Sequence, residues 1–173
     1  MDSIIQQVIN GLSLGSVYAL IAVGYSLVYS ILLFSNFAHG GFLVIGGYIC
    51  YFALRSFGMN IWLASIAALI GAGLSAVIVE RLAYKPIRER TPITLYMLIA
   101  SMGMSIVIEN IFVVTVGGRF RALPPVIPTQ PVNFFGLATT SAFDILSLVT
   151  AVVFLAGLQL FLTKTKWGLA IRA

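Results

Sequence analysis

Five apolar runs, separated by short connections, constrain this 173-residue sequence more than any other feature. A helix needs roughly 20 apolar residues to cross the hydrocarbon core of a bilayer, and each run is about that long. The predicted spans are residues 11–34, 37–57, 61–79, 93–116 and 145–162. The runs predict an all-α fold, a polytopic integral membrane helical bundle of about five transmembrane helices that occupies residues 1–173 as a single domain.

The composition supports the same class. Only 9% of the residues are charged and 60% are hydrophobic, whereas soluble domains have about 25% charged residues. So few charges cannot cover a globular surface, and a bilayer is therefore the expected solvent. The net charge of +5 does not indicate a nucleic-acid partner, because the basic residues lie at the ends of apolar runs, next to lipid headgroups and the cytosol.

The basic residues also predict an orientation. Two segments on the same side of a five-span chain contain Arg81, Lys85, Arg88, Arg90, Lys164, Lys166 and Arg172, and the other side contains Arg55, Arg119 and Arg121. The positive-inside rule then places the connection at about 80–92 in the cytosol and the Pro-rich loop at about 117–143 outside the cell. A segment at 35–47 that re-enters the membrane would change the side of everything before residue 61.

The segment SNFAHGGFLVIGG, residues 35–47, places polar residues and glycines between two apolar runs. Asn36 (or Ser35) is a suitable N-cap for a helix that starts near Phe37, and His39 falls in the first turn of that helix. A helix N-terminus at membrane depth can hold an anionic group, and Gly40 leaves room for one. The alternative is a tight turn at the membrane edge. The segment thus predicts a re-entrant or broken helix, or a turn.

A second polar feature lies within the fourth run. Ser101, Ser105 and Glu109 are spaced i, i+4, i+8 and form one line along a helix. An ionisable group at this depth costs about 3 kcal/mol and normally faces the interior of a bundle. The stripe is interpreted either as the lining of a translocation path or as a structural hydrogen bond between helices.

Small residues at four-residue spacing indicate close helix packing in lipid. The third run contains one such set, and there packing is the favoured interpretation: Ala64, Ala68, Ala72 and Ala76. In the first run Gly11, Gly15 and Ala19 have the same spacing, and packing and chance explain them equally well.

Motifs of enzymes are absent from the sequence. One histidine and one cysteine cannot form a His/Cys metal cluster. There is no G-x-S-x-G elbow and no phosphate-binding loop, so the chain is not expected to hydrolyse ATP. No catalytic residue, metal or cofactor is therefore predicted.

Several segments together resemble one family. GLSLGSVYALIAVGYSLVYSILLFSNFAHGGFLVIGGY, residues 11–48, is similar to the signature region of the permease subunits of branched-chain amino acid ABC importers, and its N-F-A-H-G element includes Asn36, His39 and Gly40. Further similar segments are ERLAYKPIRER (80–90), IASMGMSIVIENIF (99–112), FRALPP (120–125) and TKTKWGLAIRA (163–173). The resemblance implies a multi-pass permease of the cell inner membrane.

The resemblance also implies partners and a substrate. The permease would pair with a second permease subunit, two ATP-binding cassette ATPase subunits and an extracytoplasmic amino-acid-binding protein. It would carry leucine, isoleucine or valine by alternating access; relatives that carry urea, amides or other amino acids provide the alternative. Gly168, Arg172 and Ala173 match the stretch that leads into the loop docking on the ATPase.

Family members continue with further spans after the Arg-Ala pair at which this sequence ends. The chain thus resembles the N-terminal portion of a permease. The expectation is that these 173 residues alone insert in the membrane without supporting uptake or stimulating the ATPase. A truncated, non-transporting membrane scaffold is the alternative from another class.

Overall fold

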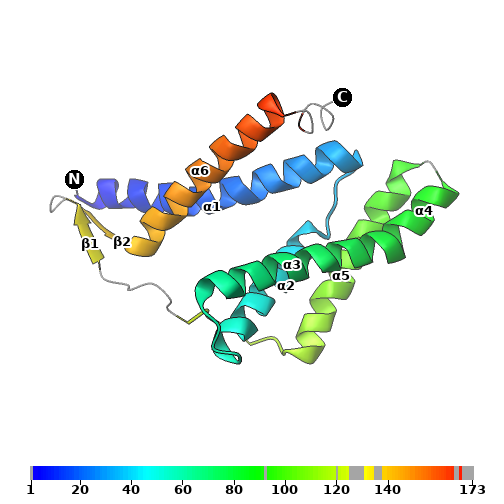
Figure 1. Ribbon diagram of the computed structural model, residues 1–173, viewed down its shortest axis with the longest axis horizontal. Helices are drawn as coiled ribbons and strands as arrows, with labels where there is room; N and C mark the ends of the chain where they lie inside the picture. Colours follow the sequence, from blue (N-terminus) through cyan, green and yellow to red (C-terminus); the bar gives the residue numbers. More distant parts are fainter. Residues whose placement is uncertain are drawn as a thin grey trace. The chain divides into compact units, whose positions relative to one another are not determined.

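The computed structural model describes residues 2–91, 93–119, 121–124, 131–134, 138–165 and 168 (Figure 1). The helices are α1 (Asp2–Leu32), α2 (His39–Arg55), α3 (Ile61–Val79), the π-helical segment η1 (Glu80–Tyr84), α4 (Lys85–Arg90), α5 (Thr94–Thr115) and α6 (Ala142–Lys164). Two compact units divide the chain, residues 1–31 with 125–173 and residues 32–124. Each unit is described by itself.

The predicted helical membrane class is confirmed. Four stretches are long and apolar enough to cross a membrane: Ile4–Leu32, Ile61–Arg90, Thr94–Thr115 and Asp144–Lys164. The second predicted span corresponds to α2, whose 17 residues reach about 26 Å, less than the roughly 30 Å of a hydrocarbon core. The expected break in this region lies at residues 33–38, which are not helical.

Predicted helix ends agree best for the third span. α3 has the bounds predicted for the third span, and the side chain of Asn60 accepts a hydrogen bond from the Leu63 N–H at 2.9 Å at its start. α1 instead begins nine residues before the predicted span, because its polar first turns are helical without being apolar. Gln6 donates to Asn10 one turn later at 2.9 Å there.

In the first unit α1 and α6 meet through the Ser13–Asp144 hydrogen bond. The unit also contains a small antiparallel hairpin, β1 (Pro131–Phe134) and β2 (Ala138–Ser141), inside the segment predicted as a loop. Ser13 and Ser16 are the buried polar residues of α1. Gly11 and Gly15 are exposed, and nothing described lies within 4 Å of a Cβ built at either. In this chain the serines of α1, rather than its glycines, therefore face the partner helix.

In the second unit α2 and α3 form an antiparallel helical hairpin. A Cβ built at Gly46 would lie 3.6 Å from the Ala72 Cβ and 3.7 Å from the Ala68 carbonyl oxygen. A Cβ at Gly71 would overlap Ile49. Ala64 is fully buried. The predicted packing role of the alanine stripe is confirmed for these three alanines, because small residues on both helices let the backbones approach closely.

The charged connection expected at about 80–92 is helical as far as Arg90. In η1 the Lys85 N–H donates to the Glu80 carbonyl oxygen, five residues back instead of four. The extra residue lets Pro86 fall in the first turn of α4, where its missing N–H is tolerated. Glu80 accepts a hydrogen bond from Arg88 at 2.7 Å.

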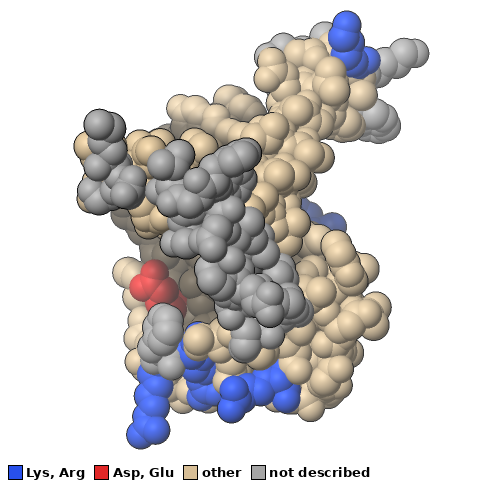
Figure 2. All heavy atoms as spheres, turned by 90° about the vertical axis from the view of Figure 1, so that its left-hand side faces the viewer, with Lys and Arg blue, Asp and Glu red and all other residues tan. Residues whose placement is uncertain are grey.

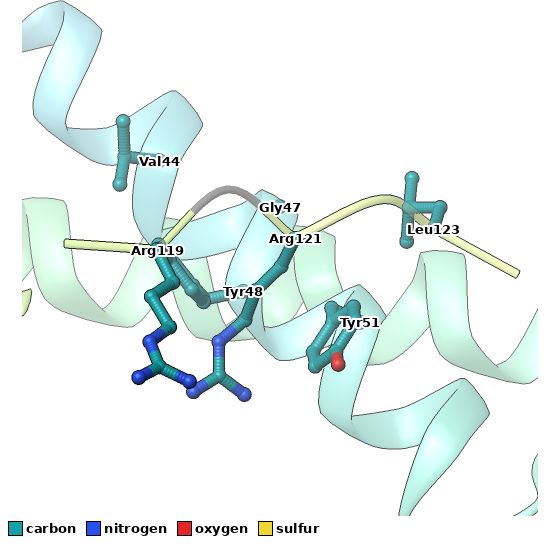
Figure 3. Close-up of a pocket in the computed structure, with 7 residues that line it drawn as sticks. All are labelled: Val44, Gly47, Tyr48, Tyr51, Arg119, Arg121 and Leu123. Carbon is teal, nitrogen blue, oxygen red and sulfur yellow. The ribbon is translucent and has the colours of Figure 1, made fainter. Parts of the chain in front are cut away.

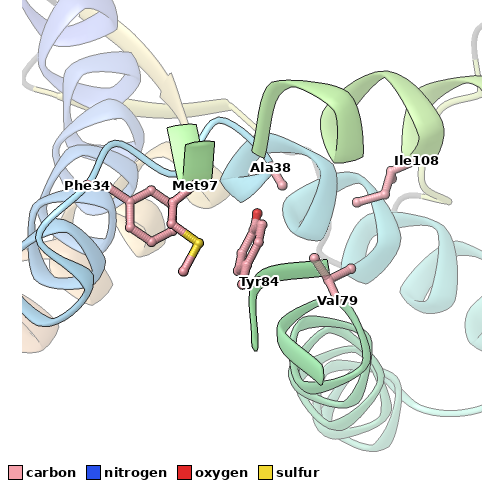
Figure 4. Packing of buried hydrophobic residues seen from close by; sticks show 6 residues of the cluster. All are labelled: Phe34, Ala38, Val79, Tyr84, Met97 and Ile108. Atoms are coloured by element: carbon pink, nitrogen blue, oxygen red, sulfur yellow. The ribbon is translucent and has the colours of Figure 1, made fainter. Parts of the chain in front are cut away.

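The core of the second unit surrounds the chain that enters α2. Its buried members, drawn in Figure 4, are Phe34, Ala38, Val79, Tyr84, Met97 and Ile108. Most other large apolar side chains are exposed, such as Trp62 and Val114. Figure 2 shows the same pattern: most of the visible described surface is uncharged, and the basic side chains gather in a few patches. Apolar surface of this extent is expected of helices solvated by lipid or by neighbouring subunits.

Candidate functional site: the Phe34–Ala38 turn

The chain between α1 and α2 forms a buried turn, Phe34–Ala38. α1 stops because Leu33 adopts a left-handed backbone conformation, φ 58°, which costs a non-glycine residue roughly 1–2 kcal/mol. The Leu33 side chain is exposed, whereas Phe34, Asn36 and Ala38 are each 5% exposed or less. Surrounding contacts must therefore hold this conformation in place.

Asn36 provides the first set of these contacts. Its side-chain oxygen Oδ1 accepts hydrogen bonds from the Ala38 N–H at 3.1 Å and from the Tyr84 hydroxyl at 2.8 Å. The first bond makes an Asx turn within the segment, and the second joins the turn to η1. The Tyr84 ring also packs edge-on against Phe34, with the centroids 5.6 Å apart.

Asn36 was predicted as the N-cap of a helix starting near Phe37, and this prediction is wrong by two residues. α2 begins at His39, and Ala38 occupies the N-cap position without a side-chain acceptor. The Asx turn is the physical reason, because the Asn36 oxygen bonds the N–H two residues ahead and keeps Phe37 out of the helix. The Asn36 carbonyl oxygen instead accepts from the His39 N–H at 3.2 Å.

Ser101 on α5 provides the second set of contacts. This residue is fully buried. Its hydroxyl oxygen accepts from the Phe37 N–H at 3.2 Å, and the hydroxyl donates toward the carbonyl oxygens of Leu98 at 2.8 Å and Ser35 at 3.2 Å. Irregular backbone at membrane depth is tolerated only where protein groups satisfy it. Ser101 and Asn36 meet that requirement from two sides of the turn.

His39 and Gly40 follow the turn in the first residues of α2. His39 is half-buried, and Gly40 is exposed with nothing within 4 Å of a Cβ built on it. Gly41 is buried, and a Cβ there would lie 3.0 Å from the Ile108 Cδ1. The glycine that permits close packing is therefore Gly41, while Gly40 borders open space.

The predicted polar stripe on α5 does not form one surface. Ser101 is buried, Ser105 is half-buried and Glu109 is exposed. Each step of four residues turns about 40° around a helix, so Glu109 lies about 80° away from Ser101. The packed face of α5 instead follows Met97, Ser101, Met104 and Ile108. Glu109 accepts a hydrogen bond from the Ser105 hydroxyl at 3.3 Å.

Of the residues predicted to couple to an ATPase, the structure describes Gly168. Its N–H donates to the Thr165 hydroxyl at 3.0 Å, and a Cβ at this position would overlap the backbone of Phe161 and Leu162. Only glycine fits where the chain leaves α6 so tightly. Arg172 and Ala173 lie outside the described residues.

Sequence reasoning missed two polar contacts. One is Tyr84, whose hydroxyl has its partner 48 positions earlier in the chain. The other is Asp144 in the first turn of α6, which accepts a hydrogen bond from the Ser13 hydroxyl at 2.8 Å. Ser13 and Asp144 border a pocket of about 330 Å³ in the first unit. Asp144 is one of only five acidic residues in the sequence, and that rarity was the available signal.

A satisfied polar turn among apolar helices, together with four candidate spans, defines a polytopic helical membrane protein. Residues 7–173 match the family described as "Branched-chain amino acid transport system / permease component". The chain belongs to this family, whose members are permease components and not ATP-hydrolysing enzymes.

Individual relatives agree. The chain is 36% identical over 183 residues to the "High-affinity branched-chain amino acid transport system permease protein BraD" of Pseudomonas aeruginosa, with 98% of the chain and 58% of the relative covered. It is 38% identical over 181 residues, with the same coverage, to the corresponding protein LivH of Escherichia coli. A "Probable branched-chain amino acid transport permease protein LivH" of Methanocaldococcus jannaschii is 27% identical, with 89% of the chain and 49% of the relative covered. No solved structure matches the chain.

Proposed function

We propose that this chain is part of the membrane permease of an ATP-binding cassette importer that carries leucine, isoleucine and valine across the cytoplasmic membrane. The family match over residues 7–173 and the names of the relatives support this proposal. The chain spans 58% of the length of these relatives, so the transport activity belongs to the subunit that contains this sequence.

The observation that carries the proposal is the pinned Phe34–Ala38 turn. Polar groups this well satisfied inside an apolar core are an arrangement that transporters use beside their translocation paths. Asn36 and Ser101 use their hydrogen bonds to hold the turn itself. They therefore act as positioning residues that shape the path.

The residues beside the turn are the better candidates for lining the path. His39 and Ser105 are half-buried, and Gly40 and Glu109 are exposed. These four side chains or backbone positions can face a passing polar solute while the turn stays packed. In this proposal these four residues line the path, and Asn36 and Ser101 hold the turn in position.

The proposal includes the partners that the resemblance implies. A second permease subunit would cover part of the exposed apolar surface, two ATPase subunits would act from the cytosolic side, and an extracytoplasmic binding protein would deliver the amino acid. Gly168 lies four residues after the end of α6, and its N–H bonds the Thr165 hydroxyl, which suits the start of a docking segment for the ATPase. ATP is hydrolysed by the ATPase subunits and not by this chain.

The test is uptake into proteoliposomes that contain the subunit with this sequence and its cognate partners. We expect ATP-dependent uptake of labelled leucine, isoleucine and valine. Preferential uptake of urea or an amide would mean that the proposed substrate is wrong. If no solute were taken up, the alternative of a non-transporting membrane scaffold would be favoured. Glu109→Gln and His39→Gln should lower uptake while leaving the amount of assembled complex unchanged. Normal uptake by both variants would remove these residues from the path.

A further inference from the structure

A pocket of about 320 Å³ in the second unit lies between the middle turns of α2 and the segment that follows α5. Its lining consists of Val44, Gly47, Tyr48, Tyr51, Arg119, Arg121 and Leu123 (Figure 3). The pocket is distinct from the Phe34–Ala38 turn, because the two share no residue. Its volume is at the lower limit of ligand pockets, so it suits only a small molecule.

Arg121 is held in place by the chain itself. Its guanidinium nitrogen Nη2 donates to the Val116 carbonyl oxygen at 2.9 Å, at the end of α5. The guanidinium carbon also lies 5.7 Å from the centre of the Tyr51 ring. A helix carboxyl end and an aromatic face both attract a cation. Arg121 is thus a preorganised positive charge at the wall of the pocket.

The contacts that hold Arg121 in place have no counterpart at Arg119 among the described residues. Figure 3 shows its guanidinium pointing in the same direction as that of Arg121. The three ion pairs among the described residues all use Glu80 or Glu89 in the η1–α4 segment, and none uses Arg119 or Arg121. Arg119 and Arg121 are both exposed, so solvent screens their mutual repulsion, and they offer two cationic donors to an anion that enters the pocket.

The rest of the lining is apolar or aromatic. Val44 and Leu123 have aliphatic side chains. The Tyr48 ring stacks on Phe112, with the centroids 4.6 Å apart and the planes 13° apart, which fixes its orientation. A carboxylate can meet the guanidinium groups while a short aliphatic body contacts these walls.

We propose that this pocket binds a small aliphatic carboxylate through Arg119 and Arg121. The free carboxylate of an aliphatic amino acid has this chemistry, and its identification with a transported amino acid rests on the proposed function. The proposed binding of a carboxylate does not rest on the proposed function, because it depends only on the carboxylate and the pocket lining.

The test measures binding of isocaproate to the chain in phosphatidylcholine nanodiscs, by ligand-observed NMR and titration. Isocaproamide is the matched probe, since it keeps the size and loses the negative charge. We expect its Kd to be at least about tenfold higher, because a charge-assisted hydrogen bond contributes about 1.5–3 kcal/mol. R119Q and R121Q should raise the Kd of isocaproate by a similar factor. R55Q is the control, because Arg55 is an exposed arginine at the end of α2 outside the pocket.

Equal binding of the acid and the amide, or unchanged binding by both pocket variants, would overturn the proposal. So would displacement of isocaproate when phosphatidylglycerol enters the nanodiscs, because the arginines would then hold a lipid phosphate. Competition by leucine would extend the site to amino acids. No step of the test uses uptake, so a failed transport assay and a failed binding assay remain distinguishable.

Discussion

The Phe34–Ala38 turn and the contact between α1 and α6 both bring polar side chains among apolar helices. In the turn, Asn36 and Ser101 each use several hydrogen bonds, and both are almost completely buried. Between α1 and α6, the Ser13 hydroxyl donates to Asp144 beside a pocket, and Asp144 is only half-buried. The first contact is closed and specifies one backbone conformation. The second is open and leaves its carboxylate accessible.

Burial decides the free-energy cost of losing a hydrogen-bond partner. A buried donor or acceptor left unsatisfied costs about 1–3 kcal/mol, whereas an accessible one can find another partner. Substitutions at the closed contact should therefore have larger effects than chemically similar substitutions at the open contact.

The largest effect is expected for Asn36→Leu. This change removes the acceptor of both the Ala38 N–H and the Tyr84 hydroxyl and leaves two donors unpaired in the core. We expect the free energy of unfolding in mixed detergent micelles to fall by about 3 kcal/mol. A decrease no larger than that of Ser13→Ala would mean that the two contacts do not differ in the proposed way.

Gly41→Ala should have the next largest effect. Its new methyl group would lie 3.0 Å from the Ile108 Cδ1, and overpacking of this kind costs about 1–3 kcal/mol. The neighbouring Gly40→Ala is the control, because open space surrounds Gly40. Thermal unfolding of both variants, and of Gly41→Ala combined with Ile108→Ala, gives the test. Relative to Ile108→Ala alone, adding Gly41→Ala should cost little stability, and an unchanged cost would mean that the packing explanation is incorrect.

Tyr84→Phe isolates the bond between η1 and the turn. The ring and its edge-on contact with Phe34 remain, and the Asn36 side chain keeps the Ala38 N–H. Only one acceptor site on Asn36 becomes unpaired, so a loss of about 1 kcal/mol is expected. A double-mutant cycle with Asn36→Leu should show coupling between the two positions. Additive losses would show that the bond does not contribute.

Ser13→Ala should have the smallest effect, about 0.5 kcal/mol, because the open pocket lets another donor reach Asp144. Unfolding in the same micelles provides the measurement. A loss as large as that of Asn36→Leu would show that this contact is closed after all.

The sequence predicted local features better than distant contacts. The bounds of α3 followed from an apolar run, which is a local feature, and the Asn60 cap at its start was not part of that prediction. The packing of Ala68 and Ala72 followed from spacing alone. Asn36 was correctly identified as a notable polar residue. Its bond to Tyr84 depends on the π-helical register of η1, which no residue pattern predicted. Spacing placed Ser101, Ser105 and Glu109 on a line along α5, but it could not predict that Ser101 is buried while Glu109 is exposed.

The π-helical segment has a consequence for the kinds of mutation that this chain can tolerate. Its five residues, Glu80–Tyr84, contain one more residue than an α-helical turn needs. Because an i→i+5 turn and an i→i+4 turn each close about one turn of helix, deleting one of these residues would restore regular α-helix and leave the residues on both sides close to their present orientation. The same deletion inside α3, which is regular α-helix, would instead turn every later residue by about 100° relative to the residues before it. In a library of variants, we therefore expect a single-residue deletion at the exposed Leu82 to be tolerated better than one in the middle of α3. This segment holds a spare residue that the rest of the helix does not have.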